Sequence, residues 1–301
     1  MEPQPLKVRY RHLFKDLAAL SRAENNITEE NVFQPANKDI LKIITGMLEE
    51  NVLPDSELRG QEHLRDFLSR VKGGQRGLIL MEHYSNFDLP GFYYFLQEKG
   101  GEAGRDIADR LVAISGLKLN EDNAMVSAWA EAYSRIIIYP SRGLASITDP
   151  VKHAEEDARS KKINFASMRV MDRLRKEGKV LLVFPSGTRY RPGKPETRRG
   201  VREIDSYIRL SDVMMPVSIN GNCLRISDKP EDMLEDMVYQ DTIIMEAGPV
   251  LECKPFREEV LDSVPEEMED KKQAVVDRVM DILLQMHEKN EAELTARRNC
   301  G

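Results

Sequence analysis

Short apolar runs alternate along the chain with longer segments in which apolar residues recur every three or four positions. The short runs have the length of buried strands, and the longer segments have the spacing of helices that bury one face. The alternation predicts an α/β fold with a mixed, mainly parallel central sheet covered by helices. The expected strands are 78–81, 111–114, 136–139, 180–184, 213–219 and 242–245, and the expected helices between them are 88–98, 122–133, 154–177 and 200–210.

The first 75 residues lack this alternation and show helical periodicity instead. Two segments, 39–53 and 58–71, place apolar residues at helical spacing. We therefore expect a helical N-terminal domain over residues 1–75 and an α/β domain over residues 76–301. A further long amphipathic helix is expected over 266–298.

Composition narrows the class of protein. The chain has 301 residues, of which 41% are hydrophobic and 32% charged, as in an ordinary globular protein. A net charge of −7 argues against a general nucleic-acid binder. No run approaches the roughly eighteen apolar residues of a membrane span. The basic amphipathic segment 6–20 is expected to pack as a surface helix, with peripheral membrane contact as the alternative.

Cysteine usage indicates the compartment and bears on metal binding. Cys223, Cys253 and Cys300 are far apart, so they form neither a metal-ligand pair nor an even disulfide set. We expect a reducing, cytosol-like location, or the plastid stroma if the protein comes from a plant. No metal site and no bound cofactor are expected.

The candidate chemistry begins at the end of the first expected strand. His83 follows the apolar run 78–81, and Asp88 begins the next expected helix, with Pro90 in its first turn. A turn of this length can fold the Asp88 carboxylate back onto the imidazole, fixing its tautomer and leaving the other ring nitrogen free to take a proton. The structural alternative is that Asp88 only caps the helix and His83 is a hydrogen-bonded turn residue.

A second candidate site follows the strand expected at 180–184. Ser186, Gly187 and Thr188 form a turn, and Arg189 and Arg191 follow it two residues apart. Side chains at i and i+2 of an extended chain point the same way, so two guanidinium groups could grip one phosphate. The alternative is a surface loop with solvated arginines.

Arg142 lies at a third strand end, after the run 136–138. There it could contact an anion or form a salt bridge. A histidine base beside several arginines suits transfer of a group to a hydroxyl on a phosphorylated molecule.

Four blocks in this order resemble the glycerolipid acyltransferase family. The first is the His-x4-Asp block, and the second is an apolar strand that ends at Arg142. The third is Phe-Pro-Ser-Gly-Thr-Arg at 184–189, and the fourth is the apolar stretch 213–217 around Pro216. Ser186 replaces the glutamate that is usual in the third block. This replacement, together with Arg191 and the proline after it, resembles the soluble, plastid-type glycerol-3-phosphate acyltransferases.

The resemblance implies a reaction and a role for each residue. His83 would act as base toward the sn-1 hydroxyl of glycerol 3-phosphate, oriented by Asp88, while Arg189, Arg191 and Arg142 hold the phosphate. The plastid-type subfamily has a Lys-His pair after the second block that helps to hold the phosphate; the corresponding region here is Ser141-Arg142-Gly143, with Arg142 in its place. The acyl donor would be a thioester of acyl-carrier protein or coenzyme A, used as co-substrate rather than cofactor.

Three other functions remain open. The acceptor could be lysophosphatidate, which would give phosphatidate. Ser186 could act as a covalent nucleophile, although the Gly-x-Ser-x-Gly elbow is absent. The third reading is a non-catalytic binder of phosphoesters or lipids on the same fold.

Overall fold

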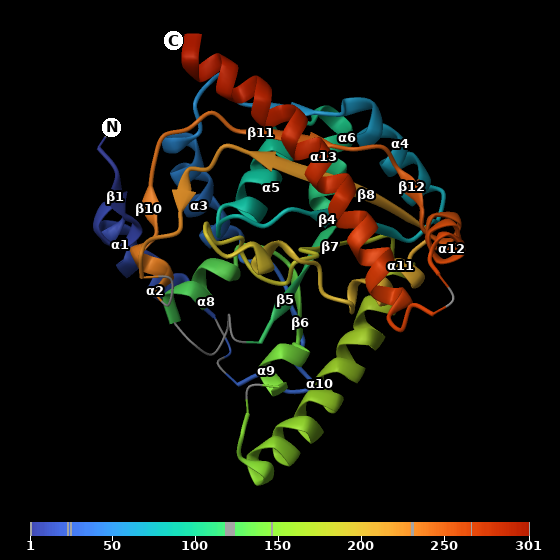
Figure 1. The fold of residues 1–301 in the computed structure, drawn as a ribbon. Helices are drawn as coiled ribbons and strands as arrows, with labels where there is room; N and C mark the ends of the chain where they lie inside the picture. Colours follow the sequence, from blue (N-terminus) through green and yellow to red (C-terminus); the bar gives the residue numbers. More distant parts are fainter. Residues whose placement is uncertain are drawn as a thin grey trace.

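A nine-stranded sheet forms the centre of the molecule, which is a computed structural model (Figure 1). The structure describes residues 2–22, 24, 26–117, 124–145, 147–229, 232–265 and 267–300, without the side chains at 124, 125, 142, 145, 299 and 300. The strands lie in the order β2-β6-β5-β7-β4-β8-β11-β3, with β12 pairing β8. Their bounds are β2 Phe33–Gln34, β3 Glu57–Arg59, β4 Gly77–Met81, β5 Leu111–Gly116, β6 Arg135–Ile138, β7 Val180–Val183, β8 Val213–Asn220, β11 Ile244–Ala247 and β12 Leu251–Glu252.

The sheet is mixed and mostly parallel, as the sequence predicts. Strands β6, β5, β7, β4 and β8 are parallel to one another. Strand β2 runs antiparallel to β6, and β11 and β12 both run antiparallel to β8. Every residue of β4 and of β7 is buried. Strands covered on both faces carry apolar residues on both sides, which explains their continuous apolar runs.

Helices cover both faces of this sheet and make up about 53% of the chain. One face packs against α3, α4, α5 and α6, and the other against α10 to α13. Because both cores are continuous across several strands, the carboxyl ends of β4 and β7 are held rigidly beside each other. The bounds are α3 Lys38–Asn51, α4 Gln61–Lys72, α5 Asp88–Glu98, α6 Gly101–Arg110, α8 Ala124–Ala130, α9 Ser141–Ala145, α10 Pro150–Lys176, α11 Ile204–Arg209, α12 Cys253–Ser263 and α13 Lys271–Cys300.

A separate helical N-terminal domain over residues 1–75 is not confirmed. This segment gives β2 and β3 to the central sheet, and β1 (Gln4–Pro5) to a small sheet with β10 (Met237–Val238) and β9 (Leu224–Arg225). Many of its buried residues, among them Leu48, share one core with the central strands. Strands of two or three residues are too short to show an alternating pattern, so the sequence did not reveal them.

The segment 6–20 packs inward, as expected for a surface helix. It divides into α1 (Leu6–Arg9), a short 3-10 turn and α2 (Phe14–Leu20). Leu6, Tyr10 and Leu17 are all buried. The apolar face of this basic segment is therefore already covered by the protein.

Several helix boundaries differ from those predicted. The helix expected over 58–71 begins at Gln61, because Leu58 belongs to β3 and Gly60 turns the chain with φ +78. The helices α6 and α12 were not predicted; α6 is rich in glycine and charge, which weakens its periodicity. Part of the helix expected over 122–133 lies outside the described residues.

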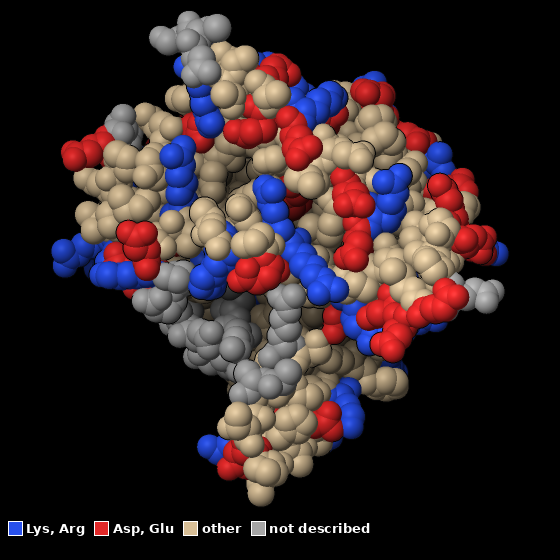
Figure 2. Space-filling view, viewed as in Figure 1, with Lys and Arg blue, Asp and Glu red and all other residues tan. Residues whose placement is uncertain are grey.

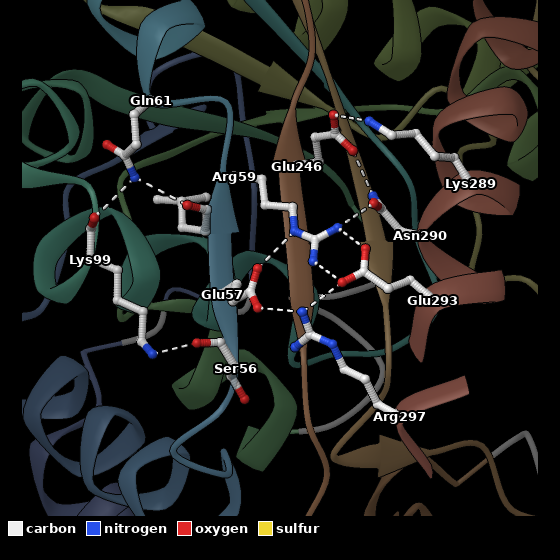
Figure 3. A network of polar contacts seen from close by, with 11 residues as sticks. Ser56, Glu57, Arg59, Gln61, Lys99, Glu246, Lys289, Asn290, Glu293 and Arg297 are labelled. Atoms are coloured by element: carbon white, nitrogen blue, oxygen red, sulfur yellow. Dashed lines mark hydrogen bonds and ion pairs between the residues drawn. The ribbon is translucent and has the colours of Figure 1, made fainter. Parts of the chain in front are cut away.

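The C-terminal helix α13 is fastened across the edge of the sheet by ion pairs (Figure 3). Arg59 on β3 bonds Glu293 through both terminal nitrogens, at 2.7 and 2.8 Å. Arg297 bonds Glu57 at 2.7 Å and Glu293 at 2.6 Å. Across the described helices, none has the combination of length and apolar character that spanning a bilayer requires.

Candidate functional site

His83 and Asp88 come together at the carboxyl end of β4. The Asp88 carboxylate bonds the imidazole Nδ1 of His83 at 2.8 Å and accepts a hydrogen bond from the backbone N–H of Ser85, also at 2.8 Å. The backbone N–H of Tyr84 donates to the same Asp88 oxygen. Asp88 is only 4% exposed, and a buried carboxylate needs such donors to compensate for lost water. The turn predicted from the sequence thus holds the two side chains within hydrogen-bonding distance.

The other ring nitrogen of His83 is left for a reactant. An ionised Asp88 can only accept, so in the neutral imidazole that pairs with it the proton lies on Nδ1 and Nε2 presents its lone pair. No hydrogen bond joins Nε2 to any described residue. The ring lies flat on Phe184, with centroids 3.9 Å apart and an angle of 15° between the planes. Stacking and the bond to Asp88 together fix the direction in which Nε2 points.

The loop after β7 packs directly against His83. Gly187 adopts φ +62, and its N–H donates to the carbonyl of Phe184 at 2.9 Å, which closes a tight turn. The hydroxyl of Ser186 donates to the carbonyl of Thr188 at 2.7 Å. Tyr190 then donates its N–H to the carbonyl of His83 at 2.8 Å. Tyr190 lies between Arg189 and Arg191, so this backbone bond holds the arginine loop against His83.

Arg189 and Arg191 lie in different surroundings. Arg189 is 7% exposed and bonds the carboxylate of Asp236, which is fully buried. Burial raises the pKa of Asp236, and the charge of Arg189 only partly opposes this. Arg191 is half-buried: its Nε is buried without a hydrogen-bond partner, and none of the described carboxylates bonds its guanidinium. Arg191 is therefore available to an anion, whereas Arg189 is already engaged.

Arg142 lies in α9, the helix that follows β6. Its side chain is outside the described residues, so its proposed contact with a phosphate stays a prediction. The strand end before it is fixed by Asn164 of α10. The amide of Asn164 accepts from the N–H of Tyr139 at 2.8 Å and donates to its carbonyl at 3.0 Å.

A polar network behind His83 was missed by the sequence reasoning. The hydroxyl of Tyr84 donates to Glu82 at 2.8 Å and lies 3.1 Å from Nδ1 of His287 on α13. Arg198 donates to the same hydroxyl at 3.1 Å. Both neighbours of His83 in sequence are thereby tied to distant parts of the chain. Glu82 and Tyr84 could have been noted for flanking His83, but their partners lie more than 100 residues away.

His287 is also linked to Glu82 directly, at 3.1 Å. Burial lowers the pKa of His287, but the hydrogen bond to Glu82 and its charge outweigh burial and raise that pKa above 6.5. The proton on His287 therefore helps to hold α13 against the end of β4.

Two hollows lie beside this strand end. One is a narrow apolar cavity of about 20 Å³ next to Asp88, lined by residues such as Phe95, Ile219 and Met245, with room for about one water molecule. The other is an open polar cleft of about 260 Å³ lined by residues such as Tyr84, His287 and Arg298. Figure 2 shows the molecule hollowed beside α13 on this side. As it stands, the apolar cavity is too small for a long acyl chain.

The chemistry available is therefore that of an oriented base beside an anion-binding arginine. Within the described ranges, no group of three or more His, Cys, Asp or Glu residues is placed to hold a metal ion. Compared with protein-family models and with curated proteins, the chain matches none of them. The resemblance to glycerolipid acyltransferases consequently depends on the four sequence blocks alone.

Proposed function

We propose that this protein transfers an acyl group from a thioester to the sn-1 hydroxyl of glycerol 3-phosphate, which gives lysophosphatidate. The observation that carries the proposal is the 2.8 Å bond between His83 and Asp88, with Nε2 of the imidazole left unbonded among the described groups. Arg191 directly follows Tyr190, the residue whose N–H bonds the carbonyl of His83, and no described carboxylate bonds its guanidinium; this supports a phosphorylated acceptor.

In the proposed reaction, Nε2 of His83 takes the proton of the acceptor hydroxyl as its oxygen attacks the thioester carbonyl. Asp88 stabilises the imidazolium that forms, without taking the proton itself. The tetrahedral intermediate collapses, the new ester remains, and the thiolate leaves with the proton returned by His83. A positioned base of this kind contributes roughly 10²–10⁴-fold to the rate.

Arg191 would bind the phosphate and so select which hydroxyl meets His83. Arg142 would add to this contact from the end of β6. Arg189 would act differently, because its bond to Asp236 uses its charge to hold the loop. We therefore assign the larger share of phosphate binding to Arg191.

The hydroxyl of Ser186 bears on the alternative of a covalent serine mechanism. It donates to the carbonyl of Thr188 and has no hydrogen bond to His83, the base such a mechanism would need. We expect Ser186→Ala to retain turnover. A variant without turnover that traps no acyl-enzyme would mean that Ser186 shapes the loop.

Acyl transfer is tested with glycerol 3-phosphate and with lysophosphatidate as acceptors, each with acyl-carrier-protein and coenzyme A thioesters. His83→Ala should abolish turnover but keep acceptor binding, whereas His153→Ala on the exposed start of α10 should match wild type. Arg191→Ala should raise the acceptor KM mainly, with Lys194→Ala in the same loop as control. Turnover with lysophosphatidate but not with glycerol 3-phosphate would identify lysophosphatidate as the acceptor. Unchanged turnover in His83→Ala would refute the proposed base.

A further inference from the structure

The helix α10 presents a stripe of exposed apolar and basic side chains that the proposed reaction does not use. We define the outer stripe as Val151, Lys161, Lys162, Phe165, Met168 and Arg169. Its apolar members are unusually open to water, with exposures of 68% for Val151, 64% for Phe165 and 56% for Met168.

These side chains share one face because of their spacing. Residues three or four apart lie above one another on a helix, so Phe165 stands between Lys161 and Lys162 on one side and Met168 and Arg169 on the other. The opposite face of α10 is buried and includes Ile163, Ser167, Met171 and Leu174. The outer stripe therefore points away from the protein that α10 packs against.

The position of the helix leaves this stripe accessible. The start of α10 projects beyond the sheet (Figure 1), and every residue from 151 to 155 is exposed. On the view in Figure 2, this projecting end is largely tan, with blue and red side chains at its margins. A projecting convex helix can rest on a flat surface, whereas it offers no groove to a peptide.

The charge around the stripe indicates what that surface is. Residues 150–176 hold eight Lys or Arg and four Asp or Glu, in a chain whose net charge is −7. Lys161 is paired with Asp157 at 2.6 Å, but Lys162 and Arg169 bond no carboxylate among the described residues. Arg169 instead lies 6.0 Å from the centre of the Phe165 ring. Exposed apolar side chains between unpaired cations match an anionic lipid surface, where the apolar groups enter the interface and the cations meet the headgroups.

The stripe does not suit a coiled coil with a second copy. Such an interface needs apolar residues repeating every 3.5 positions over several heptads. Here Lys161 and Lys162 interrupt the spacing between Val151 and Phe165.

We propose that the outer stripe of α10 docks the protein on the surface of an anionic membrane. The residue before Phe165 is Asn164, whose two bonds to Tyr139 fix the end of β6. Docking would thus bring the end of β6, which leads to Arg142, toward the lipid surface. Binding is measured without substrates, so its outcome is separate from that of the proposed acyl transfer.

Sedimentation with vesicles tests this proposal directly. We expect wild type to sediment with vesicles of equal parts phosphatidylcholine and phosphatidylglycerol, but not with phosphatidylcholine alone, and to be released by salt. Phe165→Ser with Met168→Ser should abolish binding. Lys162→Glu with Arg169→Glu should weaken it by about tenfold or more, because each cation near an anionic bilayer contributes several-fold.

The control reverses two other exposed cations, Lys42→Glu with Lys254→Glu, which lie outside α10 and pair with Asp39 and Glu258. This control changes the net charge by the same amount as the stripe variant and should bind much more tightly than it. A Phe165→Trp variant should shift its fluorescence to shorter wavelength on anionic vesicles, since Trp129 is the chain's single tryptophan. Failure of wild type to bind, or equal losses in the stripe and control variants, would overturn the proposal. So would a stripe variant that changes the oligomeric state instead, because the face would then join copies of this chain.

Discussion

Arg189 and Arg191 are two residues apart, yet their removal should affect different properties: Arg189 supports the stability of the fold, and Arg191 supports binding of the acceptor. Arg189→Met keeps an aliphatic side chain in place but removes the charge opposite Asp236. Asp236 is 0% exposed, and its remaining donor is the N–H of Ser227 at 3.3 Å. Removing one partner of a buried ion pair costs roughly 3–5 kcal/mol, because the other charge stays buried without compensation.

This cost can be read from urea unfolding. With a denaturant slope of about 3 kcal/mol per molar urea, a loss of that size lowers the midpoint by about 1–2 M. Arg191→Ala removes a side chain with no carboxylate partner among the described residues, and should change the free energy of unfolding by about 0.5 kcal/mol or less. The effect of Arg191→Ala should appear instead in the acceptor KM.

The pH dependence gives an internal check. Burial raises the pKa of Asp236, and loss of Arg189 removes the charge that partly opposes that rise. A carboxyl with a raised folded pKa destabilises the protein above that pKa and ceases to do so once it is protonated. The deficit of Arg189→Met should therefore shrink as the pH falls, and Asp236→Asn should recover most of it at neutral pH.

The result that would refute this reasoning is an Arg189→Met protein with the urea midpoint of wild type. The buried pair would then place no constraint on the loop, and Arg189 would be as free as Arg191 to bind a phosphate.

Three other predictions follow from single contacts. Gly60→Ala should destabilise the protein strongly, because a Cβ there would meet the carbonyl oxygen of Ala247 at 1.9 Å; Gly74→Ala, also at positive φ but with open space, should cost far less in the same unfolding assay. Hydrogen bonds from Arg59 and Arg297 lower the pKa of Glu293 to about 2. The contribution of Glu293 to folding stability is therefore full above about pH 4.5 and is lost as the pH falls toward 2. Glu293→Gln should flatten that part of a curve of Tm against pH. The raised pKa of His287 predicts the reverse dependence on pH. The contribution of His287 to folding stability is full below about pH 6.5 and is lost as the pH rises through the pKa of the folded protein. His287→Gln should remove this loss of stability at higher pH.

The sequence by itself determined the central fold and, within the candidate site, the pairing of His83 with Asp88. The strands buried on both faces, β4 and β7, stand out as continuous apolar runs, and α5 begins at Asp88 as its turn residues predict. The bond between His83 and Asp88 was also predictable, because five residues of chain and a turn bring the two together. These features are local, so their physical causes can be read within a short stretch of sequence.

Tertiary structure decided what each polar side chain does once distant segments meet. Arg189 and Arg191 are indistinguishable in the sequence, and only the return of the chain at Asp236 separates a buried ion pair from an unengaged cation. His287 lies 204 residues from His83, yet through Glu82 it is joined to the same strand end. The N-terminal 75 residues show helical periodicity but enter the central sheet through β2 and β3. Contacts between residues far apart in the sequence depend on which surfaces the folded chain brings together. That is a property of the assembled core rather than of any one segment.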